Sequence, residues 1–164
     1  MNYHNITHDD MLNGDGLRVV LWVAGCSHHC PGCQNPVTWN PNDGILFDGN
    51  AWKEIENQLE KDYIEGITFS GGDPLFRGNR SDITTLCKII KDGYPNKTIW
   101  LYTGYLYEDI KDLPIMDFID VLVDGSYIDK LKDTKLKWKG SSNQRVIDVK
   151  ETRKTGNIIL HMEG

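Results

Sequence analysis

Three cysteines close together in the sequence carry the most evident chemistry. Cys26, Cys30 and Cys33 lie within eight residues in the spacing C-x3-C-x2-C, so one tight loop can turn their thiols toward a common centre. Structural zinc sites close a tetrahedron with four protein ligands, either cysteine alone or cysteine with histidine. A [4Fe–4S] cluster held by three cysteines instead leaves one iron open to another ligand. The spacing therefore predicts a metal centre, with a cluster favoured over zinc.

Other interpretations of the cysteines are weaker or stay open. A disulfide is disfavoured, because three cysteines cannot all pair and the thiols of cytosolic proteins stay reduced. Zinc is an alternative, with His28, His29 or a remote residue as its fourth ligand. The fourth cysteine, Cys87, lies on the apolar side of a predicted helix. We expect it to be a core thiol rather than a ligand.

Length and net charge limit the classes of function that the chain can have. With 164 residues the chain is long enough to bury a core, and we expect residues 1–164 to form a single domain. A formal net charge of −6 argues against nucleic-acid binding, which needs a basic face. No apolar run approaches the ~18 residues of a membrane-spanning helix, and residues 1–4 do not resemble a signal peptide. Reduced cysteines without an export signal predict a cytoplasmic protein.

Four apolar segments that alternate with helical patterns must position the cysteine loop. The predicted strands cover residues 17–23, 66–70, 98–102 and 118–123. The predicted helices cover residues 50–63 with Asn50 as the cap, 81–93 with Asn79 or Ser81 as the cap, and 106–113. This alternation predicts an α/β domain with parallel strands. Polar, glycine-bearing residues follow each strand, and the carboxyl ends of parallel strands share one edge, so we expect one site there.

Three further segments carry weaker signals. Residues 1–16 are polar and end in Asn13-Gly14-Asp15-Gly16, which predicts an N-terminal turn segment. We expect residues 146–164 to form a tail, in which residues 157–162 are either a short edge strand or mobile. The lysines between residues 130 and 139 predict a solvated face or a contact surface for an acidic partner.

The cysteine loop at the end of an apolar strand resembles the cluster motif of the radical S-adenosylmethionine superfamily. More narrowly, the chain is similar to the activating proteins of anaerobic ribonucleoside-triphosphate reductases. The stretches that carry this resemblance, in the family's order, cover residues 13–14, 26–33, 70–75, 99–105, 123–125 and 138–145. Three positions depart from the usual patterns. Gly32 and Gln34 flank the third cysteine where aromatic residues are common, and Asp15 stands where the activases often have proline.

The resemblance implies a fold and a set of site residues. The fold would be α/β, a shortened, open partial (β/α) barrel of parallel strands. Cys26, Cys30 and Cys33 would hold a [4Fe–4S] cluster whose open iron binds the amino and carboxylate groups of S-adenosylmethionine. The implied cofactor-binding residues are Gly32, Cys33, Gln34, Gly71, Gly72, Asp73, Pro74 and Thr103. Backbone carbonyls at the Gly-Gly turn, together with Asp73, would accept hydrogen bonds from the methionine ammonium group.

The resemblance also implies a reaction and partners. Reductive cleavage of S-adenosylmethionine would abstract hydrogen from one glycine of a large reductase subunit and leave a glycyl radical there. The implied partners are that subunit and a reduced electron donor such as flavodoxin, with neither nucleic acid nor membrane involved. The sequence leaves open whether the protein forms a homodimer. Residues 138–145 are the candidate for rim closure or docking, because Trp138 and Arg145 are residue types enriched in binding hot spots.

Two alternative functions stay open at this point. The first is a radical enzyme that modifies a small molecule, although the chain has little room for the extra elements that would enclose such a substrate. The second is a zinc-binding interaction module without catalysis. It requires a fourth protein ligand, for which His28 and His29 are candidates.

Overall fold

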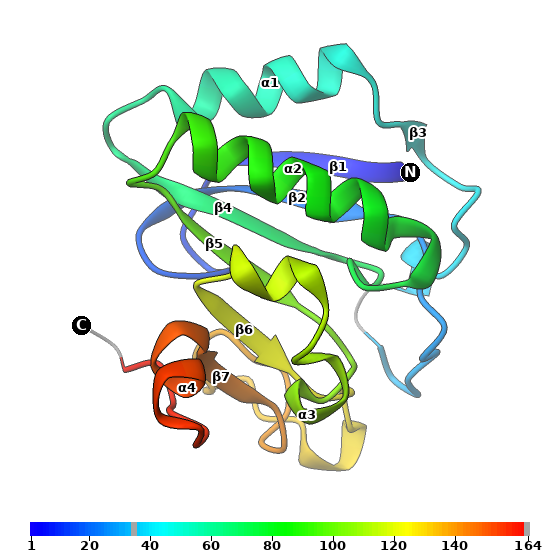
Figure 1. Cartoon of the computed structure of the whole chain (residues 1–164). Coiled ribbons are helices and arrows are strands. Elements are labelled where there is room, and N and C mark those ends of the chain that lie inside the picture. Colours follow the sequence, from blue (N-terminus) through cyan, green and yellow to red (C-terminus); the bar gives the residue numbers. More distant parts are fainter. Residues whose placement is uncertain (34–35, 163–164) are drawn as a thin grey trace.

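A computed structural model describes residues 1–33 and 36–162, which form an open sheet with helices packed on it (Figure 1). Within these residues the sheet has seven strands in the order β3-β1-β2-β4-β5-β6-β7. The strands are β1 (Asn2–Asp10), β2 (Leu17–Val23), β3 (Ile45–Leu46), β4 (Ile64–Gly71), β5 (Thr98–Tyr102), β6 (Val121–Asp124) and β7 (Arg145–Asp148). The α-helices are α1 (Gly49–Leu59), α2 (Arg80–Gly93), α3 (Tyr107–Ile110) and α4 (Val149–Thr155). In this part of the chain no helix has the length and apolar character needed to cross a membrane.

The centre of the sheet is parallel and its two sides are antiparallel. β2 pairs with β4, β4 with β5 and β5 with β6 in parallel. β1 runs antiparallel to β2 and β3, and β7 runs antiparallel to β6. The α/β class and the four predicted strands are confirmed, since β2, β4, β5 and β6 overlap them. The expectation of a partial barrel made of parallel strands is not confirmed, because the sheet is mixed and does not close.

The N-terminal segment, which we expected to consist of turns, contains the nine-residue strand β1. Most of its side chains are polar, and Ile6 is the residue of this strand that is buried. Pairing with β2 holds the strand, with Ile6 opposite Leu21 and Thr7 opposite Val20. The Trp22 indole N–H also donates to the Thr7 hydroxyl at 3.1 Å. An antiparallel strand near the edge of a sheet needs little apolar surface, so its composition did not reveal it.

The C-terminal segment, expected to be a tail, is built onto the sheet by β7 and α4. The Asp148 carboxylate accepts a hydrogen bond from the Glu151 N–H at 3.1 Å and caps α4. Gly156 ends this helix in the left-handed conformation, with φ of 78°. Leu160 then bridges Ile147 in antiparallel fashion. Of the two expectations for residues 157–162, the structure therefore shows pairing at the sheet edge.

The main apolar core lies between the sheet and the two long helices α1 and α2 (Figure 1). Ile55 and Leu59 of α1 are fully buried in it. Cys87 of α2 is also fully buried, as predicted, and this burial raises the pKa of its thiol far above the ordinary value. The cap of α1 is Asp48, whose carboxylate accepts from the Asn50 N–H at 3.0 Å. The prediction of Asn50 as the cap is therefore wrong, and an ionised carboxylate also suits the positive end of the helix dipole.

Arg18 ties three strands together at the end of the sheet remote from the cysteine loop. Its side chain is fully buried. The guanidinium donates to the hydroxyl groups of Thr68 and Thr98, each at 2.9 Å. It also donates to the backbone carbonyls of Asp15, Ile67 and Thr98, at 3.1, 2.9 and 2.8 Å. Neutral acceptors therefore hold this cation, and burial lowers its pKa to about 10.

Candidate metal and cofactor site

A cavity of about 740 Å³ lies at the carboxyl ends of the parallel strands. Residues that follow β2, β4, β5 and β6 line it. Among the residues predicted for the site, those lining this cavity are Cys26, Cys30, Cys33, Gly71, Gly72, Asp73 and Thr103. Gly32 and Pro74 are not among the lining residues, and Gln34 lies outside the described residues. The parallel order of the strands thus brings the cysteine loop and the Gly-Gly turn to one place.

The three loop cysteines are half-buried. Burial raises the pKa of the Cys26 thiol, and hydrogen bonds from the backbone N–H groups of His28 and His29 offset part of this effect. Within the described residues no three His, Cys, Asp or Glu side chains are already gathered for a metal ion. Soft thiolates from one loop facing one cavity suit iron–sulfur chemistry.

Both histidines of the cysteine loop have partners away from the thiols. The His28 Nε2–H donates to the Asp73 carboxylate at 2.6 Å, and the ring meets Tyr105 edge-on at a centroid distance of 4.6 Å. His29 stacks on Trp39 with a centroid distance of 4.5 Å and an angle of 13° between the ring planes. His29 also has a positive φ of 48°, which a non-glycine residue adopts only under constraint. These contacts argue against either ring as the fourth ligand of a zinc site.

Asp73 joins the loops that follow three different strands. The carboxylate is 1% exposed, and its Oδ2 accepts from His28, from the Thr103 hydroxyl at 3.0 Å and from the Gly104 N–H at 2.9 Å. Its Oδ1 accepts from the Leu75 N–H at 2.8 Å. A carboxylate offers about four acceptor positions. Asp73 was expected to accept from a cofactor ammonium group, and in this structure four protein donors already bond its carboxylate.

The two glycines of the Gly-Gly turn are required by the close approach of the cysteine loop. A Cβ atom at Gly71, where φ is 99°, would lie 2.6 Å from the Val23 nitrogen, and one at Gly72 would lie 2.4 Å from the Gly25 carbonyl oxygen. The backbones are also hydrogen-bonded, from Gly72 N–H to Val23 O at 2.8 Å and from Asp73 N–H to Gly25 O at 2.7 Å. These glycines therefore set the distance between the turn and the thiols as well as exposing backbone to the cavity.

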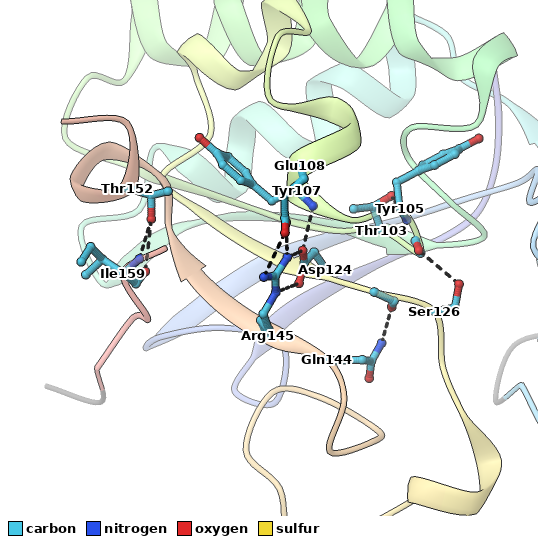
Figure 2. A network of polar contacts seen from close by, with 12 residues as sticks. Thr103, Tyr105, Tyr107, Glu108, Asp124, Ser126, Gln144, Arg145, Thr152 and Ile159 are labelled. Atoms are coloured by element: carbon cyan, nitrogen blue, oxygen red, sulfur yellow. Dashed lines mark hydrogen bonds and ion pairs between the residues drawn. The ribbon is translucent and has the colours of Figure 1, made fainter. Parts of the chain in front are cut away.

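Residues 138–145 form part of the cavity wall and are tied into the fold. The Arg145 guanidinium bonds the Asp124 carboxylate through Nε at 3.0 Å and Nη2 at 2.5 Å, and Nη2 also reaches Glu108 at 2.5 Å (Figure 2). Trp138 is 9% exposed and packs edge-on against Trp100 at a centroid distance of 4.9 Å. Both side chains proposed as hot spots are therefore occupied within the chain, which agrees with rim closure better than with docking.

Lysines of the neighbouring segment form a positive rim at the cavity. Segment 130–139 carries five lysines and one aspartate in a chain whose net charge is −6. Lys132, Lys135 and Lys137 are exposed and line the cavity. The predicted solvated face thus lies at the opening of the candidate site rather than on a remote surface.

Comparison with known proteins identifies the family. A family described as "4Fe-4S single cluster domain" matches residues 12–147. A protein of Enterobacteria phage T4 is 49% identical over 146 residues, which cover 89% of this chain and 93% of the relative. A protein of Escherichia coli K12 is 44% identical over 150 residues, covering 89% and 97%, and one of Haemophilus influenzae is 38% identical over 148 residues, covering 88% and 96%. All three are named anaerobic ribonucleoside-triphosphate reductase-activating protein.

The chain belongs to this family of reductase-activating proteins. Family membership confirms the resemblance drawn from the cysteine loop and the stretches after each strand. The matched region includes the three loop cysteines, the Gly-Gly turn and the segment that closes the rim. In this activating protein, the 4Fe–4S match agrees with a cluster rather than zinc at the cysteine loop.

Sequence reasoning missed several residues that line the cavity of this activating protein. Trp22 and Tyr102 line it from β2 and β5. The period-two alternation of strand side chains would have found both, because their neighbours in the strands are buried on the opposite face. The Tyr102 hydroxyl is buried and has no hydrogen-bond partner within the described residues. Met11 and Leu12, which are 71% and 80% exposed, also line the cavity, and no pattern in the polar N-terminal segment marked them.

Proposed function

We propose that this protein activates an anaerobic ribonucleoside-triphosphate reductase with a [4Fe–4S] cluster and S-adenosylmethionine. The observation that carries the proposal is that Cys26, Cys30 and Cys33 line the same cavity as Gly71 and Gly72. The name of the relatives, which states that they activate this reductase, supports the choice of partner. When bound, the cluster and cofactor supply one-electron cleavage of a carbon–sulfur bond, and with it hydrogen abstraction from a glycine of the reductase.

The residues of the chain bind and orient in this scheme. Cys26, Cys30 and Cys33 hold the cluster as thiolates, and the half-buried loop shields it from water. The backbone of residues 71–74 binds the amino group of the cofactor, because glycine lets that backbone approach it closely. The resemblance puts the adenosine end of the cofactor near Gly32 and Cys33, and Gln34, the third residue of this prediction, lies outside the described residues. Thr103 lines the cavity. The unpartnered Tyr102 hydroxyl offers a further hydrogen bond inside the same cavity.

The reductase approaches from the side of the lysine rim. The open sheet leaves the cavity accessible, and the exposed Lys132 and Lys135 stand at its opening beside the apolar Met11 and Leu12. A glycine offers no side chain for recognition, so charge and apolar area around it must provide the specificity. An acidic segment of the reductase fits this rim. A reduced donor such as flavodoxin supplies the electron. Sedimentation of the free protein would show whether it forms a homodimer or a monomer.

Anaerobic reconstitution with iron and sulfide tests the proposed cofactors. Electron paramagnetic resonance of the reduced protein should show a [4Fe–4S]⁺ signal that changes when S-adenosylmethionine is added. Added reductase should then acquire a glycyl radical. Serine substitutions at Cys26, Cys30 and Cys33 should abolish the cluster, whereas the control Cys87→Ala should retain it, because Cys87 lies on the buried face of α2 and does not line the cavity. A protein that takes up one zinc ion, forms no cluster and ignores the cofactor would refute the proposal.

Charge reversal at the rim tests the docking side. The double variant Lys132→Glu/Lys135→Glu should associate more slowly with the reductase and lose the dependence of association on ionic strength. Lys53→Glu/Lys88→Glu is the matched control, because it makes the same charge change at exposed positions of α1 and α2. Equal effects of the two double variants would show that net charge, and not the rim, governs association.

A further inference from the structure

His28 connects the cysteine loop to the Gly-Gly turn through a side chain rather than through backbone. Its Nε2 lies 2.6 Å from Asp73 Oδ2, and the carboxylate can only accept, so Nε2 carries the hydrogen. The side chains are 16% and 2% exposed, which makes this a nearly buried, charge-assisted contact. His28 and Asp73 are 45 positions apart in the sequence, so this bond joins the loops after β2 and β4.

The surroundings are shaped to receive the His28 ring. A Cβ atom at Gly104 would lie 2.6 to 2.8 Å from three atoms of this ring, so glycine at that position makes room for it. Tyr105 flanks the ring edge-on. The Arg80 guanidinium lies over the Tyr105 ring, 5.2 Å from its centroid. The loop after β5 therefore completes a socket for the imidazole.

The protein supplies four hydrogen-bond donors to the Asp73 carboxylate, three to Oδ2 and one to Oδ1. Two N–H groups of the backbone, the Thr103 hydroxyl and His28 together supply four donors to the carboxylate. A ligand bonded to Oδ2 would have to displace one of these donors, at the cost of leaving it unsatisfied. The carboxylate therefore holds together the loops that follow β2, β4 and β5.

We propose that His28 and Asp73 are positioning residues that pin the cysteine loop to the Gly-Gly turn and to Thr103. The pin holds the thiols at a fixed position relative to the backbone that binds the amino group of the cofactor. This inference rests on the proposed function, since it concerns the same cluster and cofactor. His29, stacked on Trp39, fixes a second point of the loop, and the backbone hydrogen bond from Asp73 N–H to Gly25 O joins the start of the loop to the turn.

Substitutions at His28 separate the hydrogen bond from the bulk of the ring. His28→Ala removes the donor, whereas His28→Gln places an amide N–H near the position of Nε2 and can still donate to Asp73. We expect His28→Ala to assemble the cluster but to bind S-adenosylmethionine about tenfold to a hundredfold more weakly, the usual loss when a residue that orients a ligand set is removed. His28→Gln should recover most of this affinity. His8→Ala, at an exposed histidine paired with Glu54, is the control and should bind like the unsubstituted protein.

Three measurements test the pin. Isothermal titration gives the affinity for S-adenosylmethionine, electron paramagnetic resonance gives the response of the reduced cluster to it, and nitrogen NMR of the cluster-free protein reports whether His28 carries its hydrogen on Nε2. Urea unfolding of each cluster-free variant identifies any variant that does not fold, and His28→Gln then carries the test. The pin would be overturned if His28→Ala kept its affinity for S-adenosylmethionine and the response of its cluster signal. It would also be overturned if His28→Gln lost both to the same extent as His28→Ala. Failure of the unsubstituted protein to respond to the cofactor would instead overturn the proposed function.

Discussion

Replacement of Arg145 by methionine should destabilise the fold far more than loss of its exposed partner Glu108. Arg145 stands between two carboxylates that differ sharply in exposure (Figure 2). The Asp124 side chain is fully buried and also accepts a hydrogen bond from the Tyr107 N–H at 2.8 Å. The Glu108 side chain is 55% exposed. The same guanidinium therefore makes one buried and one surface ion pair.

The expected loss of stability depends on how exposed each partner of the ion pair is to solvent. Removal of one partner from a buried ion pair costs about 3–5 kcal/mol, because the remaining charge is buried without compensation. Arg145 is itself 29% exposed, so water reaches part of the site and we expect the lower end, about 3 kcal/mol, for Arg145→Met. Glu108→Gln removes a solvent-exposed partner and should cost about 0–1 kcal/mol. The double variant Asp124→Asn/Arg145→Met leaves no buried charge and should cost less than the sum of its single variants.

Equilibrium urea unfolding of the cluster-free protein, under anaerobic reducing conditions at pH 7, measures these differences. The midpoints should shift while the slope of free energy against urea stays constant. A cost of less than about 1 kcal/mol for Arg145→Met would refute the assignment of a buried, compensated charge at Asp124. So would a Glu108→Gln variant that is as unstable as Arg145→Met.

Three further predictions follow from buried polar groups and from one glycine. Arg18→Met should cost about 1–3 kcal/mol in urea unfolding, because buried carbonyl and hydroxyl acceptors lose their donor. Arg18→Lys should recover part of this loss, since lysine has three donors instead of five. Burial raises the pKa of Asp120, but hydrogen bonds from Lys91, Lys150 and the Ile99 N–H outweigh it and hold the pKa below its ordinary value of 3.8. Its stabilising contribution is therefore fully present above pH 3.8 and is lost as the pH falls through the lower folded-state pKa. The stability difference between the unsubstituted protein and Asp120→Asn should thus be constant from pH 5 to 7 and shrink in acid, and a difference that grows in acid would contradict the assignment. Gly72→Ala should reduce iron uptake during reconstitution, because its Cβ would meet the Gly25 carbonyl oxygen at 2.4 Å, whereas the control Gly49→Ala has open space and should take up iron normally.

Local pattern was sufficient for the centre of the fold and for the type of site. The strands at residues 17–23 and 98–102 were predicted with the bounds that the structure shows. Cys87 was placed in the core from its helical spacing alone, and it is fully buried. These predictions succeed because the period of apolar residues reports directly on the side of an element that is buried. The cysteine spacing likewise predicted iron–sulfur chemistry, since ligand type and number are written in one short loop.

Elements without a strong apolar period were not predictable. β1 is mostly polar and exists because β2 offers it a partner, and the pairing of Leu160 with Ile147 extends the other edge in the same way. We predicted Asn50 as the cap of α1, and the structure shows Asp48 there. Both residue types cap well, so only the path of the chain decides between them.

From the sequence we predicted that the loop cysteines and the Gly-Gly turn share one site and that parallel strands gather them at one edge, and both line one cavity. The contacts of each polar side chain there became evident from the tertiary structure. Asp73 has the residue type and the position of a ligand for an ammonium group, yet its carboxylate already accepts from four protein donors, one of them 45 positions away. Arg145 has the type of a docking residue, yet it compensates Asp124. Hydrogen bonds and charge compensation depend on distances of a few ångströms between remote segments, and no local pattern encodes those distances.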